Sequence, residues 1–174
     1  ALRWEAPNWF GETFPFRIVS LVGKIDRYLA EGRLHLDPSS NPDRITYHDS
    51  CNMARTGGVI EEPRRVLRAA VQNFVEMTPN RQEAYCCGGG GGLVALPEYQ
   101  EIRLRAGGPK ARQIQETGAR MVVAACENCR LQIGELSHEY NLGIEVSAVA
   151  DPVVRALRLP PTRHEAEKLF ASQE

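Results

Sequence analysis

The chain has 174 residues, of which 43% are hydrophobic and 25% are charged, a composition typical of an ordinary globular protein with one domain and some additional chain. This composition excludes collagen-like, disordered and coiled-coil proteins. The formal net charge of −1 gives no reason to expect nucleic acid or an anionic membrane surface as a partner, and no apolar stretch approaches the roughly 20 residues that span a bilayer.

The N-terminal part, residues 1–43, has little regular pattern outside one helix. Residues 1–16 mix aromatic side chains with prolines and predict irregular chain. Residues 17–34 repeat apolar side chains at the spacing of one helical face and predict an amphipathic helix that stops at Gly32. Residues 35–43 hold two prolines and two serines and predict a loop. We therefore expect this part to precede the main domain.

From residue 44 onward, short apolar runs alternate with helical patterns. Strands are predicted at residues 44–48, 83–86, 121–125 and 144–149. Residues 121–125 are all apolar, as in a strand that is buried on both faces of a parallel sheet. The alternation predicts an α/β fold, with a mostly parallel sheet flanked by helices in a Rossmann-like three-layer arrangement.

The predicted helices lie between these strands. One begins near Pro63, which a first helical turn accepts, and buries a stripe made of Val66, Leu67, Ala70, Val71 and Phe74. The others are expected over residues 98–117 with an interruption at Gly107-Gly108-Pro109, over residues 127–140, and as a final segment over residues 152–157. We expect the main domain to cover residues 44–157 and a polar tail to cover residues 158–174.

The five cysteines follow three of the predicted strands. Cys51 follows the first strand, Cys86 and Cys87 the second, and Cys126 and Cys129 the third. Ligands bind at the carboxyl edge of open α/β sheets, because loops from neighbouring strands converge there. Structural cysteines buried in a core are the alternative, but these five lie in turns beside glycine, asparagine and serine. The sequence therefore predicts one site built from all five thiols.

Two further features bear on the setting of this site. An odd number of cysteines and no recognisable signal peptide favour a reducing compartment, so we expect a cytoplasmic protein. The chain begins without an initiator methionine, which favours a piece of a longer polypeptide.

Cys126 and Cys129 form a C-x2-C turn that leads into a helix, where both sulfurs can face one metal and helix N–H groups stabilise thiolate charge. This motif serves zinc sites, thioredoxin-like redox pairs and iron–sulfur clusters. A thioredoxin-like pair leaves the adjacent Cys86 and Cys87 unexplained. Zinc and cubane clusters each take four protein ligands, so a fifth thiol needs a reason of its own.

A run of five glycines, residues 88–92, follows the cysteine pair directly. It permits positive φ and lets backbone N–H groups approach sulfur or a substrate. A phosphate-binding loop is a weak alternative, since no Lys-Ser or Lys-Thr pair ends the run.

Three charged or titratable residues lie near the cysteines. His48, three residues before Cys51, could donate a proton to a nascent thiolate, although a hydrogen-bonded histidine at a strand end is the commoner role. Arg55 and Arg130 could offset the charge of a bound cluster or grip an acidic partner, or they could be solvated surface residues.

The pattern C-x34-C-C-x38-C-x2-C, over about residues 45–157, resembles the cysteine-rich CCG domain of heterodisulfide reductase B and D subunits. The segments HDSCNMAR at residues 48–55, QNFVEM at 72–77 and CCGGGGGL at 86–93 most resemble the K subunit of sulfite reductase-linked membrane complexes (DsrK) and its D-type relatives. The resemblance implies a noncubane [4Fe–4S] cluster with five cysteine ligands, which would be Cys51, Cys86, Cys87, Cys126 and Cys129. The cluster would lie against Gly88, Gly89 and Gly90.

The resemblance also implies a function in sulfur metabolism and electron transport. The cluster would cleave a disulfide or trisulfide of a sulfur-carrier protein or thiol cofactor. Electrons would come from quinol-oxidising membrane subunits through a ferredoxin-like domain or subunit, so that the protein associates with the membrane through its partners.

The chain departs from the family in having a long interval after the cysteine pair, one copy of the motif and no ferredoxin-like cysteine run. Two alternatives stay open: a structural or regulatory zinc domain that uses four of the cysteines, and an electron-relay module without catalysis. Zinc could also replace the cluster during expression.

Overall fold

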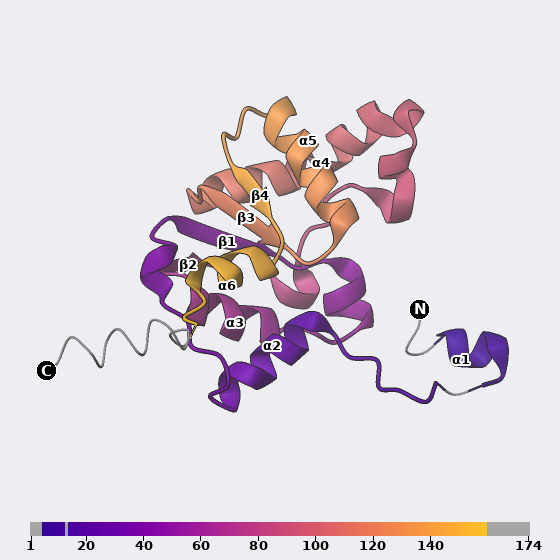
Figure 1. The fold of residues 1–174 in the computed structure, drawn as a ribbon. Coiled ribbons are helices and arrows are strands. Elements are labelled where there is room, and N and C mark those ends of the chain that lie inside the picture. Colours follow the sequence, from indigo (N-terminus) through magenta and orange to yellow (C-terminus); the bar gives the residue numbers. More distant parts are fainter. Residues whose placement is uncertain (1–4, 13, 160–174) are drawn as a thin grey trace, which may run out of the picture.

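The computed structural model describes residues 5–12 and 14–159. Their centre is a four-stranded sheet of order β2-β1-β3-β4 in which all neighbouring strands are parallel (Figure 1). The strands are β1 (Arg44–His48), β2 (Asn73–Val75), β3 (Met121–Ala124) and β4 (Glu145–Ser147). The sheet confirms the predicted α/β fold.

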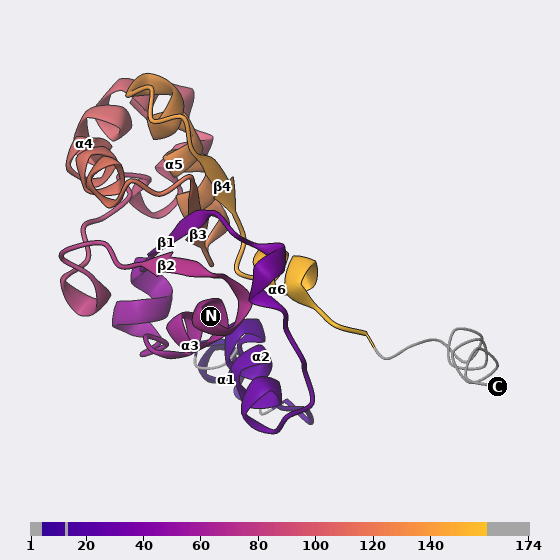
Figure 2. The same ribbon diagram turned by 90° about the vertical axis from the view of Figure 1, so that its left-hand side faces the viewer.

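Helices cover both faces of the sheet, with α4 and α5 on one face and α2, α3 and α6 on the other (Figures 1 and 2). The helices are α1 (Glu5–Phe10), α2 (Leu21–Ala30), α3 (Glu62–Ala70), α4 (Gln100–Thr117), α5 (Glu127–Glu139) and α6 (Ala150–Ala156). Shorter helical turns are Pro38–Ser40, Asn52–Thr56, Arg81–Glu83, Gly90–Ala95 and Pro97–Tyr99. No helix of these described parts is long and apolar enough to cross a bilayer.

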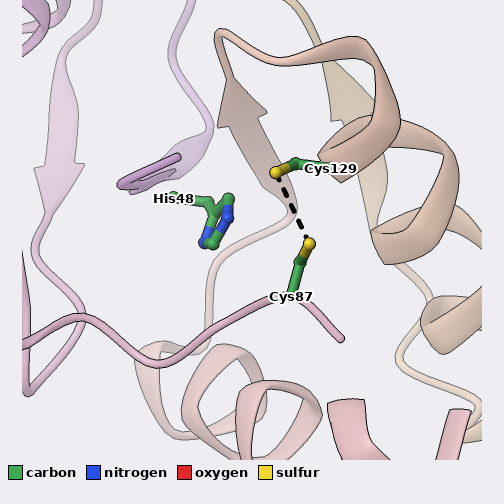
Figure 3. Close-up of side chains that lie close together, drawn as sticks. All are labelled: His48, Cys87 and Cys129. Atoms are coloured by element: carbon green, nitrogen blue, oxygen red, sulfur yellow. Dashed lines mark hydrogen bonds between the residues drawn. The ribbon is translucent and has the colours of Figure 1, made fainter. Parts of the chain in front are cut away.

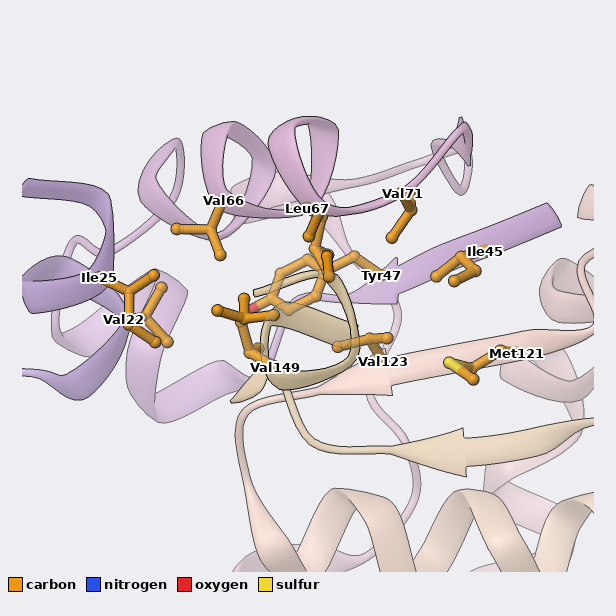
Figure 4. Packing of buried hydrophobic residues seen from close by; sticks show 13 residues of the cluster. Val22, Ile25, Ile45, Tyr47, Val66, Leu67, Val71, Met121, Val123 and Val149 are labelled. Carbon is orange, nitrogen blue, oxygen red and sulfur yellow. The ribbon is translucent and has the colours of Figure 1, made fainter. Parts of the chain in front are cut away.

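Two apolar clusters hold the layers together, and β3 contributes to both. Met121 and Val123 face α2, α3 and α6 (Figure 4), whereas Val122 and Ala124 face α4 and α5. All four residues of β3 are buried, which is why the strand has no polar alternation. The C-x2-C turn begins directly after the carboxyl end of this buried strand.

The prediction of a strand over residues 83–86 is wrong. The second strand is β2, and residues 81–83 form a 3-10 turn that leads into extended chain. The helical stripe also ends earlier than predicted: α3 stops at Ala70, Val71 is extended, and Phe74 lies on β2. The apolar spacing of this segment fits a short strand as well as a helix, so periodicity alone does not separate the two.

Two other predictions need correction. The Gly107-Gly108-Pro109 sequence does not interrupt α4, because tertiary packing holds the helix across it: a Cβ atom at Gly107 would lie 2.7 Å from Leu136 Cδ2 of α5. The N-terminal segment is not irregular throughout, since α1 forms within it. Most of the predicted polar tail, residues 160–174, lies outside the described residues.

Candidate metal centre

The first cysteine comes directly after the central strand β1. His48, Asp49 and Ser50 are buried, whereas Cys51 is exposed at the start of a short π-helical turn, Asn52–Thr56. The buried residues fix the path of the chain as it leaves the strand. They place Cys51 at the carboxyl edge of the sheet, as the sequence predicts.

Asp49 is held by a buried ion-pair network. The fully buried Arg64 guanidinium of α3 donates hydrogen bonds of 2.8 and 2.7 Å to the two Asp49 carboxylate oxygens, and one of 2.9 Å to Glu76. The backbone N–H of Arg81 donates to Asp49 at 2.6 Å. Burial raises the pKa of Asp49, but the bonds from Arg64 and Arg81 outweigh burial and hold the pKa below its usual value. The network ties the chain after β1 and β2 to α3.

Arg55 joins the Cys51 turn to the segment that carries the next two cysteines. Its guanidinium donates to the backbone carbonyl oxygens of Gln82, at 2.8 Å, and Ala84, at 2.7 Å. The cysteine pair follows these carbonyls closely in the chain. The two hydrogen bonds of Arg55 therefore help to hold the two cysteine segments together.

The glycines after the cysteine pair donate to the cysteine sulfurs. Gly88 N–H lies 3.3 Å from Cys86 Sγ, and Gly89 N–H lies 3.4 Å from Cys87 Sγ. Gly88 has φ of +91°, and a Cβ atom there would lie 2.7 Å from the carbonyl oxygen of Arg103 on α4. Only glycine fits this turn, because α4 lies directly against the backbone.

The C-x2-C turn supplies the remaining sulfurs. Cys126 is the residue before α5, and Cys129 lies buried in its first turn. The Cys87 thiol donates to Cys129 Sγ at 3.4 Å, and Figure 3 shows the His48 ring beside this pair. One ligand atom from each of these three buried residues lies within 4.8 Å of the others.

A cavity of about 50 Å³ lies where these segments meet. Four of the five cysteines line it: Cys51, Cys86, Cys87 and Cys129. Cys126 is not among its lining residues, and it packs instead against the buried cluster that contains Cys87 and Cys129. The structure thus brings four of the predicted ligands to one cavity and places the fifth beside them.

Burial changes the proton affinities in this cavity. Burial, helped by the nearby charge of Lys110, lowers the pKa of His48 to about 3, so the imidazole is neutral near pH 7. The hydrogen bond with Cys129 and burial raise the pKa of Cys87 to about 11, and contact with Cys87 raises that of Cys86. These thiols release their protons when a metal binds.

The residues present fit a thiolate-bound metal group. The sulfur donors are soft ligands of the kind that zinc and iron–sulfur clusters take, and two backbone N–H groups already point at sulfur. In addition, His48 Nδ1 is buried and has no hydrogen-bond partner within the described part of the chain. An unpartnered polar atom beside a thiol cluster favours a site that binds a further group.

Some functional features are absent from the sequence-based prediction. Lys110 of α4 is buried, and its Nζ lies 3.5 Å from the sulfur of Met77, which packs in the buried cluster that contains Cys87 and Cys129. Its spacing from Ile114 places both residues on one face of the helix, but a lysine in a helical pattern is usually solvent-exposed, so the sequence alone does not indicate its burial. Arg130, which the sequence suggested for charge compensation, instead bonds to the Ala124 carbonyl oxygen and to Glu127.

Comparison with known proteins agrees with this arrangement. The model of the CCG family, described as a cysteine-rich domain, matches residues 45–134. A probable membrane-anchored ferredoxin of Chromohalobacter salexigens is 34% identical over 97% of this chain. An Hdr-like menaquinol oxidoreductase iron–sulfur subunit of Archaeoglobus profundus is 34% identical over 73% of the chain.

A third relative is a subunit of the dihydromethanophenazine:CoB–CoM heterodisulfide reductase of Methanosarcina acetivorans, which is 30% identical over 91% of the chain. The chain spans 24% of the length of each of the first two relatives and 38% of the third. The matched region contains all five cysteines, the glycine run and three of the four strands of the sheet. The chain therefore belongs to the CCG family of cysteine-rich domains.

Proposed function

We propose that this chain is the cluster-binding domain of a heterodisulfide reductase-like iron–sulfur oxidoreductase. The observation that carries the proposal is the convergence of Cys51, Cys86, Cys87 and Cys129 on one cavity, with Cys126 packed beside it. These five residues are the ligands that we assign to a noncubane [4Fe–4S] cluster. The relatives support an iron–sulfur role, since two of those named above are a ferredoxin and an iron–sulfur subunit.

The cysteines and glycines of this site differ in position and in role. Cys87 and Cys129 close the cavity on the protein side, because both are buried, whereas Cys51 and Cys86 are exposed and face the approach from solvent. Gly88 and Gly89 donate N–H groups to sulfur and thereby stabilise thiolate charge. Bound in this way, the cluster would supply electrons and an iron site for a substrate sulfur.

The reaction that we propose is the two-electron reduction of a disulfide or trisulfide. One S–S bond breaks, two electrons enter, and each product sulfur leaves as a thiolate or takes up a proton. An open pocket of about 560 Å³ lies beside Cys86 and is lined in part by Tyr85 and Arg112, which gives a carrier protein or thiol cofactor room to approach.

The electrons would come from quinol through a ferredoxin-like domain or subunit. Two names among the relatives, a membrane-anchored ferredoxin and a menaquinol oxidoreductase subunit, favour such a source. The domain would then work on the cytoplasmic side, attached to the membrane through its partners.

A zinc domain is the second candidate, and a specific observation favours it. His48, Cys87 and Cys129 are buried together at a spacing that zinc also accepts. A cluster-bearing electron relay without catalysis would use the same five ligands, and it differs from the first candidate in binding no substrate sulfur.

The test is the iron, zinc and acid-labile sulfide content of the anaerobically prepared 174-residue chain, with an EPR spectrum after oxidation. We expect about four irons and four sulfides per chain and a spectrum unlike that of a cubane. The Cys87→Ser variant should lose the spectrum, whereas Ser137→Ala on α5, outside the cavity, should keep it. One zinc per chain without sulfide, unchanged by anaerobic reconstitution with iron and sulfide and lost in Cys87→Ser, would favour the zinc candidate and overturn the proposal.

A further inference from the structure

Lys110 is a buried cation beside the cysteine cavity that the proposed function leaves without a role. It lies on α4 and is 1% exposed. Its Nζ donates to Gln113 Oε1 and lies 3.5 Å from Met77 Sδ. Gln113 is fixed in turn, because its amide donates to the Pro79 carbonyl oxygen at 2.6 Å. Contacts within α4 and with the segment of Met77 and Pro79 therefore hold the ammonium in one place.

The charge of Lys110 has no carboxylate partner. Within residues 5–12 and 14–159, no salt bridge to Lys110 forms, although burying an unpaired ammonium is costly. Met77, whose sulfur lies 3.5 Å from Lys110 Nζ, packs in the same buried cluster as Cys87 and Cys129, and the attraction of Asp49 and of the cysteine sulfurs acts on the ammonium. Asp49 is already engaged by Arg64 and by the Arg81 N–H. Metal-bound thiolates at the cysteine cavity would be a further source of negative charge for Lys110.

The other cations near the cavity are neutralised or bound to backbone. Arg55 donates to carbonyl oxygens, and Arg81 forms an ion pair with Glu61. Arg64 pairs with Asp49 and Glu76, as described above. Burial lowers the pKa of Lys110 to about 8, while Asp49 and the thiols act to raise it, so the side chain is mostly protonated near pH 7.

We propose that Lys110 is a positioning residue that supplies the compensating positive charge for the thiolate-bound cluster and raises its reduction potential. Adding an electron to a group held by several thiolates increases its negative charge, and a fixed ammonium in a low-dielectric site stabilises the reduced state. This inference rests on the proposed function, since it requires a cluster at the cysteines.

The test is an EPR-monitored redox titration of the reconstituted 174-residue chain and its variants. Lys110→Met removes the charge and keeps a long unbranched side chain, and Lys110→Gln is a second neutral variant in case the first fails to fold. Both should shift the one-electron reduction equilibrium at least tenfold toward the oxidised form, which is about 59 mV for a one-electron couple.

Two matched variants separate charge from structure. Lys110→Arg restores the charge and should return the equilibrium to within threefold of the parent chain. Arg105→Met removes one positive charge from the exposed face of the same helix and should also change it less than threefold, because solvent screens that charge.

Each outcome decides the inference. If the neutral variants bind a cluster that has the reduction potential of the parent chain, Lys110 has a purely structural role, whether or not their melting temperatures fall. That result would overturn the inference and leave the proposed function intact. A parent chain that assembles no cluster would overturn the proposed function, and the inference with it.

Discussion

The five cysteine side chains differ in how far they reach solvent. Cys51 and Cys86 are exposed, Cys126 is half-buried, and Cys87 and Cys129 are buried. An irregular cluster held by such ligands would be closed on one side by protein and open on the other. This difference in exposure is directly measurable by chemical labelling.

We expect a maleimide to label Cys51 of the metal-free chain first and to label Cys87 and Cys129 slowest. Burial hides both slow sulfurs and contributes to the raised pKa of Cys87, which keeps it as a thiol. Peptide mapping by mass spectrometry after timed labelling measures the order. In the reconstituted chain all five should be protected. Equal rates for Cys51 and Cys129 in the metal-free chain would contradict the described geometry.

Gly88 is the glycine that the site can least replace. Gly88→Ala should destabilise the chain by about 2–4 kcal/mol, because a Cβ atom at φ of +91° would be strained and would lie 2.7 Å from the Arg103 carbonyl oxygen. Gly91→Ala is the control: its φ is +59°, but nothing lies within 4 Å of the new Cβ atom, so we expect about 1–2 kcal/mol. Urea unfolding measures both, and similar losses in the two variants would count against the close packing of α4.

At the scale of elements, the packing of α4 against α5 supports the cysteine site on its protein side. Gly107 lets the two helices approach, since a Cβ atom there would meet Leu136 and the Cys87 carbonyl oxygen, at 2.7 and 2.8 Å. The same glycine therefore positions both the helix pair and the cysteine loop.

We expect Gly107→Ala to destabilise the chain by about 1–3 kcal/mol, because the added methyl group overfills this contact. Gly134→Ala on α5 is the matched change: no atom lies within 4 Å of its Cβ position, and alanine favours a helix, so that variant should gain about 0.5–1 kcal/mol. Unfolding free energies of both variants check the pair. A neutral Gly107→Ala would show that α4 and α5 can separate at this point.

The sequence predicts some elements well and others poorly, for identifiable reasons. The apolar run that forms β3 has one interpretation, a strand buried on both faces, and the structure agrees. Residues 73–75 are too short for their periodicity to separate helix from strand, so the sequence does not predict β2. Glycine and proline inside α4 predict a break, and only contacts with α5 and the cysteine loop show why the helix continues.

For the site, the sequence predicts that the cysteine segments lie at one edge of the sheet, where four of the five cysteines line one cavity, but not what holds them there. Their common position follows from strand order, and this rule survives the wrong assignment of residues 83–86 because that segment still ends at the same edge. The roles of Arg64 and Lys110 are not predictable from one chain, since charged residues in a helical pattern are usually solvent-exposed. Their burial depends on tertiary contacts.

On the scale of the whole molecule, Arg64 links parts of the chain that are distant in sequence. It lies on α3 and bonds to Asp49 after β1 and to Glu76 after β2. Losing it would leave the buried Asp49 carboxylate with only the Arg81 N–H as a partner and would remove the shortest ion pair of Glu76, which is partly exposed.

We expect Arg64→Met to destabilise the chain by about 3–5 kcal/mol, the usual cost of breaking a buried ion pair from one side. Arg65→Met is the control, since Arg65 neighbours it on α3 and its side chain is 55% exposed where it pairs with Asp26, which predicts about 1 kcal/mol. Denaturant unfolding of both variants at pH 7 measures the difference. Equal effects would mean that the network contributes no more than a surface pair.

The hydrogen bonds of Arg55 affect which residues beside the cysteine pair can be substituted. Arg55 bonds to carbonyl oxygens, which every amino acid carries, and neither of these two bonds involves the side chain of Gln82 or Ala84. Arg55 thus fastens the loop by its backbone. The exposed position 82 therefore offers an engineer a place beside the cysteine pair where side chains of many kinds could be introduced, to recruit a different substrate, while the anchor stays the same; Ala84 is buried and lines the cavity, so it lacks this freedom.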